Sequence, residues 1–195
     1  MNLQAFLKRD SVQASLVLAV ILNAIFFPAI WRGETLLHSA WDVSSVMPAG
    51  AYHPGPSPLH FATTPDPGAP AWQTEPVLKI ISDQYLNEHR LPLWNPYSAY
   101  GTPLTAAMLP QPFYPLTALI SLHPTAWSYD ILVIGRLFLA GLLMFFFARL
   151  FLDLMASLFA AIAFMLNGYF ILYLRMPHMS VEILLPAVFL HSSYF

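Results

Sequence analysis

Three long apolar runs constrain what this chain can fold into more than any other feature of its sequence. They extend from Ala14 to Trp31, from Ile131 to Leu152 and from Leu154 to Leu174. The first is interrupted only by Asn23 and Pro28. As a helix rising 1.5 Å per residue it spans roughly 27 Å, close to the hydrocarbon thickness of a bilayer. Only 9% of the residues are charged, against about 25% in ordinary soluble domains. The runs therefore predict membrane-spanning helices.

The residues at the ends of these runs predict the orientation of the chain. Lys8 and Arg9 directly precede the first run, and the positive-inside rule then places the N-terminus in the cytoplasm. A cleaved signal peptide would also begin with basic residues, but the run is long and no small-x-small cleavage site follows it closely. The second and third runs are joined so closely that they must form an antiparallel hairpin. A fourth apolar segment starts near Val181 and still continues at Phe195.

A proline-rich segment separates the first run from the second. Fifteen of the eighteen prolines lie between Pro48 and Pro124, so we expect few long regular elements there. One exception is a helix from Glu75 to Arg90, with Thr74 as its cap and Pro76 in its first turn. A second short helix is expected from Phe113 to Leu122. Both helices either lie along the membrane interface or pack as ordinary loop helices on their own domain.

Together these features predict an all-α membrane protein. It has about four transmembrane helices, the last one incomplete, and a large Pro-rich extracytoplasmic first loop carrying short interfacial helices. Residues 1–31 form the cytoplasmic N-terminus and first transmembrane helix, residues 32–128 the extracytoplasmic loop, and residues 129–195 transmembrane helices two, three and the start of four. The net charge of −2 gives no support to a nucleic-acid partner, and the lack of cysteine excludes disulfides and thiolate metal sites.

One block of the middle segment is both rigid and aromatic. It reads Pro92-Leu93-Trp94-Asn95-Pro96-Tyr97, followed by Gly101-Thr102-Pro103-Leu104 and Phe113-Tyr114-Pro115-Leu116. Held against a membrane, such a loop suggests a site for an amphipathic substrate, above all a lipid with a polar head. Trp94 and Tyr97 could stack on a sugar while Asn95 bonds its hydroxyls. Alternatively, the rings are interface anchors, and the prolines and Asn95 simply fix the loop conformation.

Several polar residues lie in or beside the apolar runs. Burying the Arg136 charge inside a membrane span costs free energy unless the side chain snorkels to the interface or pairs with an opposite charge. We therefore take a functional role for Arg136 as the first hypothesis. Asp130, six residues earlier, is a candidate partner, although not at ideal helical spacing. We expect Arg149, near the inner end of the same run, to snorkel to the headgroups. His178 follows Pro177 at an outer turn, where it either contacts a phosphate or is a plain turn histidine.

The order of these features resembles a known family. A first helix precedes an acidic outer loop, followed by the Trp-Asn-Pro block, Gly-x-Pro-Leu, Phe-Tyr-Pro-Leu and a hairpin of spans. From about Trp72 to Leu190 the sequence resembles the N-terminal part of bacterial YfhO-like membrane proteins, which belong to the GT-C class of integral membrane glycosyltransferases. Members of the family are considerably longer than this chain. The resemblance implies a place in the bacterial inner membrane, with membrane lipid and a polyprenyl-phosphate-linked sugar as ligands and an acceptor on the outer face.

The resemblance also implies a catalytic residue. Enzymes of this class use an acidic residue in the first outer loop, and Asp42 matches by position, about ten residues beyond Trp31. A carboxylate there can accept the proton of an acceptor hydroxyl. The leaving phosphate needs positive charge, either from Arg136 or Arg175 or from a bound divalent cation such as Mg²⁺ or Mn²⁺. Asp42 and Asp66 are the candidate metal ligands.

Two further acids rank second because simpler explanations exist. Asp66 lies in a Pro-Asp-Pro-Gly sequence that turn chemistry explains. Glu75 directly precedes a proline at a helix start, where the helix dipole alone would favour it. The candidate substrate-binding residues are Glu75, Trp94, Asn95, Tyr97, Arg136, Arg175 and His178.

A second class of function stays open at this point. Because the chain ends inside an unfinished span, it could be a non-catalytic accessory or structural subunit of a larger membrane protein complex. Such a subunit would pack against other membrane subunits through small residues such as Gly135, Ala140 and Gly141. The sequence gives less support to a transporter, because Asn23 and Asn167 are the only residues that suggest a polar site in the middle of the membrane.

Overall fold

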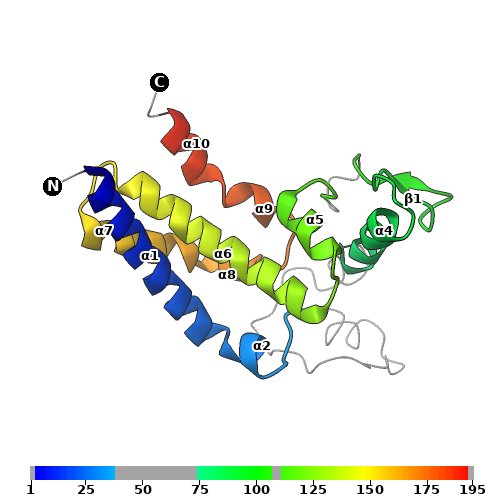
Figure 1. Cartoon of the computed structure of the whole chain (residues 1–195), viewed down its shortest axis with the longest axis horizontal. Helices are drawn as coiled ribbons and strands as arrows, with labels where there is room; N and C mark the ends of the chain where they lie inside the picture. Colours follow the sequence, from blue (N-terminus) through cyan, green and yellow to red (C-terminus); the bar gives the residue numbers. More distant parts are fainter. Residues whose placement is uncertain (1–2, 38–73, 107–110, 193–195) are drawn as a thin grey trace. The chain divides into compact units, whose positions relative to one another are not determined.

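The structure is a computed structural model that describes residues 3–37, 74–106 and 111–192, and it is mostly helical (Figure 1). This confirms the predicted helical class. Backbone contacts divide the chain into two compact units, which we call unit 1 and unit 2. Unit 1 comprises Met1–Phe27, Ile134–Leu174 and His178–Phe195, and unit 2 comprises Pro28–Val133 and Arg175–Pro177.

The helices of unit 1 are contributed by both ends of the chain. They are α1 (Leu3–Ile25), the larger part of α6 (Ala126–Ala148), α7 (Leu154–Met165), α8 (Gly168–Leu172), α9 (Met179–Glu182) and α10 (Leu185–Ser192). Unit 2 contains the start of α6 and shorter elements, namely α2 (Phe27–Trp31), α4 (Glu75–Leu86), β1 (Trp94–Asn95), β2 (Thr102–Pro103) and α5 (Pro115–Ser121).

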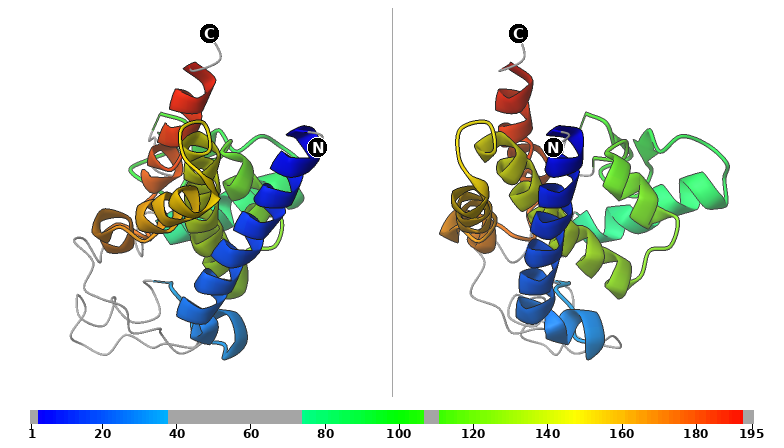
Figure 2. Two further views of the ribbon diagram at one scale, coloured as in Figure 1. Left: turned by 90° about the vertical axis from the view of Figure 1, so that its left-hand side faces the viewer. Right: turned by 60° about the vertical axis from the view of Figure 1, so that its left-hand side comes forward.

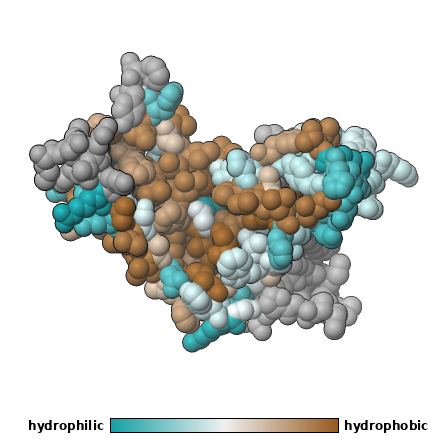
Figure 3. Space-filling model, in the orientation of Figure 1, coloured by the Kyte–Doolittle hydropathy of each residue, from teal (hydrophilic) through white to brown (hydrophobic). Residues whose placement is uncertain are grey.

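Two stretches of the described chain are long and apolar enough to cross a membrane. They are α6 and the stretch Leu154–Leu172, which contains α7 and α8. The core helix of a soluble protein would be mostly buried, but only 44% and 22% of these two apolar windows are. Hydrophobic residues accordingly cover much of the face that Figure 3 presents. The count of four transmembrane helices stays a prediction.

The first apolar run forms two helices rather than one. α1 begins at Leu3, well before the expected start at Ala14, and a turn at Phe26 separates it from α2. The break has a covalent cause, because Pro28 has no N–H to donate to the carbonyl four residues earlier. Along α1 and the turn that follows it, four side chains spaced by four residues form one buried stripe, which consists of Ala14, Leu18, Leu22 and Phe26.

α6 comes close to α1 and α7 at a glycine. A Cβ added to Gly141 would lie 3.1 Å from Met165 Sδ and 3.3 Å from Leu18 Cδ1. The neighbouring Ala140 is fully buried. Two of the small residues considered for packing against partner subunits are therefore used inside unit 1. The Cβ position of Gly135, in contrast, faces open space.

A buried ion pair joins α1 to the end of α6. Arg149 donates from Nη2 to Asp10 Oδ2 at 3.0 Å, and from Nη1 to the carbonyl of Leu152 at 2.6 Å. The two charged side chains are only 15% and 5% exposed. The snorkelling of Arg149 to the headgroups stays a prediction, and in the structure its side chain is paired with Asp10.

The third apolar run is interrupted at Asn167. Its Oδ1 accepts the N–H of Phe170 at 2.9 Å, and its Nδ2 donates to the carbonyl of Phe164 at 2.6 Å. The side chain thus ends α7 and begins α8, since an asparagine amide can replace backbone hydrogen bonds at a helix start. Asn167 therefore has a structural role as a helix cap.

In unit 2, α4 is shorter than the expected helix and ends at Leu86 rather than Arg90. Thr74 makes no side-chain capping bond and its own backbone is helical, so the prediction that it caps α4 was wrong, whereas Pro76 does lie in the first turn. The apolar face of α4 is covered, because Val77 and Ile81 form a small core with Leu104.

Two short antiparallel strands and α5 pack beside α4. Trp94 pairs with Pro103, and Asn95 with Thr102. Gln84 of α4 ties this hairpin down by donating from Nε2 to the carbonyl of Trp94 at 2.6 Å. Figure 2 shows α5 lying along α4. The helix expected from Phe113 to Leu122 is thus confirmed, with slightly closer limits.

Candidate functional site

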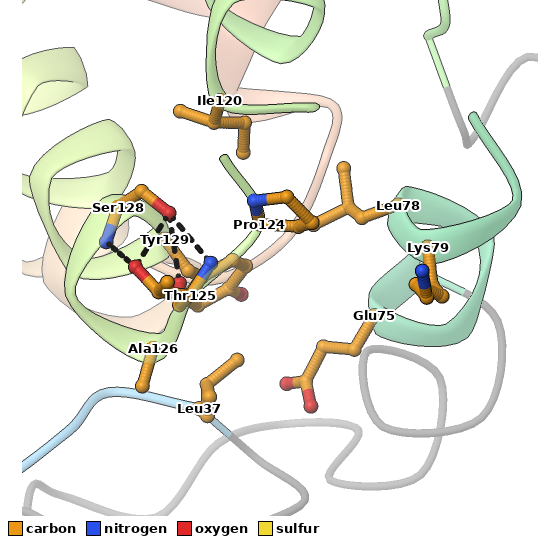
Figure 4. Close-up of a pocket in the computed structure, with 10 residues that line it drawn as sticks. All are labelled: Leu37, Glu75, Leu78, Lys79, Ile120, Pro124, Thr125, Ala126, Ser128 and Tyr129. Carbon is orange, nitrogen blue, oxygen red and sulfur yellow. Dashed lines mark hydrogen bonds between the residues drawn. The ribbon is translucent and has the colours of Figure 1, made fainter. Parts of the chain in front are cut away.

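A pocket of about 210 Å³ lies in unit 2, where α4, the end of α5 and the start of α6 meet (Figure 4). Half of its lining is apolar and consists of Leu37, Leu78, Ile120, Pro124 and Ala126. The other half carries polar groups and consists of Glu75, Lys79, Thr125, Ser128 and Tyr129. Small concave sites with a mainly apolar wall and a few converging polar groups are typical of ligand-binding pockets.

The charged groups of the pocket come from the first two turns of α4. Glu75 and Lys79 are four residues apart, and this spacing places both on the same helix face. The Glu75 carboxylate points from α4 toward Leu37 in Figure 4. The exposed Lys79 ammonium is 2.6 Å from Asp83 Oδ1. The pocket therefore offers a ligand one carboxylate acceptor and one ammonium donor.

The opposite wall is held by reciprocal hydrogen bonds at the start of α6. Thr125 Oγ1 accepts the N–H of Ser128 at 3.1 Å, and Ser128 Oγ accepts the N–H of Thr125 at 2.8 Å. Ser128 Oγ also donates to the carbonyl of His123 at 2.6 Å. This is the pattern of a capping box, which satisfies the free N–H groups of a helix start. The two hydroxyls therefore stabilise the wall of the pocket.

Behind this wall, Asp130 fixes the chain that follows α2. Its Oδ1 accepts the N–H of Leu36 at 2.8 Å and the hydroxyl of Thr35 at 3.1 Å, and all three residues are buried. Leu37, the next residue along the chain, lines the pocket. Asp130 thus holds one part of the pocket lining in place without itself reaching the pocket.

Two of the predicted substrate-binding residues converge on Asp130. Arg175 is buried in unit 2 and lies close enough to Asp130 for a favourable electrostatic interaction, while Glu75 is close enough to repel it. A buried carboxylate is costly unless hydrogen bonds or an opposite charge compensate for its lost hydration, and Asp130 has both. Asp130 thus connects electrostatically to Arg175 and to Glu75, and Glu75 lines the pocket.

Arg136 and His178 lie in unit 1, and each has contacts there. Arg136 is buried and donates to the carbonyl of Leu174 at 3.3 Å and, at the 3.5 Å limit, to Ser180 Oγ. The ring of His178 stands edge-on to that of Tyr173, with centroids 5.5 Å apart. Arg136 thereby links α6 to the segment between α8 and α9.

The three predicted residues of the Trp-Asn-Pro block belong to the hairpin, not to the pocket. Asn95 is buried, and its Oδ1 accepts the N–H of Tyr97 at 2.9 Å, which closes an Asx turn. The Trp94 indole packs against Gly101 and is about half exposed. The ring of Tyr97 is 84% exposed. Of the predicted substrate-binding residues, it is Glu75 that the described structure places in the pocket lining.

The predicted catalytic residue and metal ligands, Asp42 and Asp66, lie outside the described residues. Among residues 3–37, 74–106 and 111–192, no group of three or more His, Asp or Glu side chains is arranged to hold a metal ion. Metal binding by Asp42 and Asp66 therefore stays a prediction.

Unit 1 contains a larger cavity, of about 560 Å³, with a different lining. Apart from Asn167, Tyr169 and Glu182, its walls are apolar side chains of α7 to α10. Glu182 accepts a hydrogen bond of 2.8 Å from the hydroxyl of Tyr169, and Asn167 caps α8. The pocket of unit 2 is lined by two charged side chains, Glu75 and Lys79, whereas Glu182 is the one charged side chain in the lining of this cavity, so the pocket of unit 2 is the better candidate for chemistry.

Among the polar residues that line the pocket, sequence reasoning missed Lys79, Thr125, Ser128 and Tyr129, and it considered Asp130 only as a partner for Arg136. Lys79 could have been found from its spacing of four residues from Glu75. Asp130 carries a stronger signal, because it is the only Asp, Glu, Lys or Arg between Arg90 and Arg136. A single charge at the start of an apolar run points to a buried, partnered role.

In comparisons with known proteins, no protein-family model, curated protein or solved structure matches this chain.

Proposed function

We propose that this chain is a membrane glycosyltransferase, or the N-terminal part of one, that transfers a sugar from a polyprenyl-phosphate donor to an acceptor at the outer membrane face. The observation that carries the proposal is the pocket of unit 2, where the Glu75 carboxylate and the Lys79 ammonium face an apolar wall. A sugar ring matches such a lining, because its hydroxyls need hydrogen-bonding partners and its C–H faces pack on apolar side chains.

The size of the pocket supports a single sugar unit as the ligand. Pockets for drug-sized ligands have volumes of roughly 300–1,000 Å³, and this one has about 210 Å³. A single ring would fill it, whereas an oligosaccharide would extend outside. Glu75 would accept hydrogen bonds from the sugar hydroxyls and Lys79 would donate to them.

In the proposed reaction, the oxygen of the acceptor hydroxyl attacks the anomeric carbon of the donor. The bond between that carbon and the phosphate oxygen breaks, polyprenyl phosphate leaves, and the hydroxyl proton passes to the carboxylate of Asp42. Asp42 follows the pocket residue Leu37 by five residues. Five residues of extended chain reach at most roughly 18 Å. This chain length permits the Asp42 carboxylate to reach the pocket, as the proposal requires.

The leaving phosphate requires compensating positive charge in this mechanism. Lys79 is the cation that lines the pocket, and its exposed partner Asp83 leaves it accessible to a ligand. Arg175 is buried and interacts electrostatically with Asp130, so its positive charge would stabilise the phosphate from a distance. If a divalent cation is used, Asp42 and Asp66 would hold it, and it would polarise the phosphate oxygens.

Donor turnover by the full chain in proteoliposomes tests this proposal. The substrate is a polyprenyl-phosphate sugar labelled in the sugar, and the readouts are labelled product and released polyprenyl phosphate. Asp42→Asn should lower kcat by about a hundredfold or more, the usual contribution of a general base. Glu75→Gln should mainly raise KM, because Glu75 binds the sugar and accepts no proton in the reaction.

Glu88→Gln is the matched control, since this exposed carboxylate lies just beyond α4 and outside the pocket lining. It should transfer sugar at the wild-type rate. Unchanged transfer by Asp42→Asn would remove Asp42 from the mechanism. Unchanged KM in Glu75→Gln would remove the pocket from sugar binding.

A further inference from the structure

A long part of unit 2 has a surface unsuited to water. Residues 91–129 contain no Asp, Glu, Lys or Arg, although about a quarter of the residues in a soluble domain are charged. Large hydrophobic side chains are exposed along this stretch. They are Leu91, Leu93, Trp94, Tyr97, Tyr100, Phe113, Leu119, Leu122 and Trp127. Single exposed hydrophobic residues are normal, but a run of them without any charge marks a contact surface.

The tip of the hairpin presents its aromatic rings from a rigid backbone. Ala99 and Tyr100 have left-handed φ angles of 46° and 65°, and Gly101 follows at 108°. Residues other than glycine rarely adopt this region. The N–H of Gly101 donates to the carbonyl of Ser98 at 2.7 Å and closes the turn. The exposed rings of Tyr97 and Tyr100 are therefore held outward by a tightly closed turn.

α5 buries polar side chains together with the apolar Ile120 and exposes apolar ones. It buries the hydroxyl side chains Thr117 and Ser121, and Ser121 Oγ donates to the carbonyl of Thr117 at 2.8 Å. On its outer side it exposes Leu119, and Leu122 is exposed just beyond the helix. A surface helix facing water normally exposes polar side chains rather than leucines on its outer side. The outer side of α5 is thus suited to an apolar environment.

α4 lacks such a face. Its apolar residues Val77 and Ile81 are covered by Leu104 within unit 2. α4 exposes one large apolar side chain, Leu86, at its last residue, whereas α5 exposes Leu119 within the helix. The structure therefore separates two candidates that looked alike in sequence.

We propose that the hairpin tip, formed by residues 93–100, and the outer side of α5 together form a surface that inserts into the headgroup region of the lipid bilayer. Tyr and Trp concentrate at this depth, because one end of the ring is polar and the rest apolar. The leucines add buried apolar area, and no charge in residues 91–129 has to be dehydrated. A bilayer is the occupant because this stretch continues directly into α6, a helix long and apolar enough to cross a membrane. The inference is independent of the proposed glycosyl transfer.

Site-specific fluorescence in lipid vesicles tests the inference on the full chain. The chain contains no cysteine, so Tyr97→Cys, Tyr100→Cys and Leu119→Cys each provide one labelling site for a polarity-sensitive dye. Glu88→Cys provides a control position in unit 2 that carries a charge. Ser98→Cys labels the same turn without removing an aromatic ring. The vesicles contain phosphatidylcholine and phosphatidylglycerol in equal parts, with a nitroxide near the headgroup of a fraction of the lipids.

Dyes at positions 97, 98, 100 and 119 should show blue-shifted emission and several-fold stronger quenching by the nitroxide lipids than the dye at position 88. Quenching equal to that at position 88 would overturn the inference, because the surface would then lie in water. Blue-shifted emission without lipid quenching would overturn it as well, since the surface would then be covered by protein.

Discussion

Asp130, near the start of α6, accepts a hydrogen bond of 2.8 Å from the backbone N–H of Leu36, which lies 94 residues earlier in the chain. The same carboxylate oxygen accepts the hydroxyl of Thr35. Together these bonds fasten the segment that follows the first helices to the beginning of the second long apolar helix. Because Leu37 lines the pocket, this contact connects the packing of unit 2 to its candidate site.

Removing this carboxylate should cost more stability than removing an exposed one. Asp130→Ala leaves the buried N–H of Leu36 without its acceptor and removes a buried negative charge that interacts favourably with Arg175, which should cost about 3 kcal/mol. Asp153→Ala removes only a helix cap, whose side chain accepts the N–H of Ala156, and should cost about 1 kcal/mol. Unfolding in detergent measures both. The double variant Asp130→Ala/Arg175→Met should regain part of the loss. If Asp130→Ala and Asp153→Ala lost equal stability, the hydrogen bonds of Asp130 to Thr35 and Leu36 would not stabilise the fold as proposed.

The buried pair of Asp10 and Arg149 should tolerate exchange but not the loss of one partner. Asp10→Asn or Arg149→Gln alone should destabilise the chain by about 3 kcal/mol, since each leaves a buried charge uncompensated. Asp10→Arg/Arg149→Asp should restore most of this loss. Arg90→Gln, which breaks an exposed pair with Glu88, should cost less than about 1 kcal/mol. If Asp10→Arg/Arg149→Asp were less stable than both Asp10→Asn and Arg149→Gln, the attraction between opposite charges would not explain the stability of this pair.

The same substitution at two glycines of α6 should lower stability at one and leave it nearly unchanged at the other. Gly141→Leu places a side chain against Met165 and Leu18, and overpacking of this kind costs about 1–3 kcal/mol. Gly135→Leu meets open space and should change stability by no more than about 0.5 kcal/mol. Thermal unfolding in the same detergent distinguishes them. A larger loss for Gly135→Leu would show that the crossing point of the helices lies elsewhere.

Gly101 and Gly33 both have positive φ angles, but only Gly101 has a neighbour at its Cβ position. An added Cβ there would lie 2.5 Å from Trp94 Nε1, so Gly101→Ala must displace the indole ring. Gly33→Ala adds only backbone strain of about 1 kcal/mol. The indole N–H resonance of Trp94 should therefore shift in Gly101→Ala and stay in place in Gly33→Ala. An unshifted resonance in Gly101→Ala would contradict the packing of the hairpin.

Apolar periodicity predicted where helices occur, but not where they break. The starts of α4 and α7 and the limits of α5 were close to expectation. The break at Phe26 depends on one missing N–H at Pro28, and the break at Asn167 depends on a side chain replacing backbone hydrogen bonds. The apolar periodicity continues across both positions, so the periodicity alone does not predict either break. Thr74 shows the converse, because a suitable capping residue was present but its backbone stayed helical.

The site was less predictable because its geometry depends on long-range contacts. Glu75 reaches the pocket as a consequence of its position at a helix start, which is a local feature. Asp130 was considered as a partner for Arg136 on the same helix, yet its hydrogen bonds go to Thr35 and Leu36. Asn95 was a candidate sugar ligand, but its carbonyl oxygen accepts the N–H of Tyr97 in a local turn. Residue type alone does not distinguish a polar group that binds a ligand from one that stabilises a loop.

The proposed donor, acid and pocket all require unit 2 to lie on the external side of the membrane. Labelling Glu88→Cys in intact cells with a membrane-impermeant thiol reagent tests this most directly, because the chain has no cysteine of its own to react. The account predicts that the thiol at position 88 is modified before lysis as completely as after it. Modification only after lysis would place unit 2 in the cytoplasm and contradict the proposed reaction at the outer face.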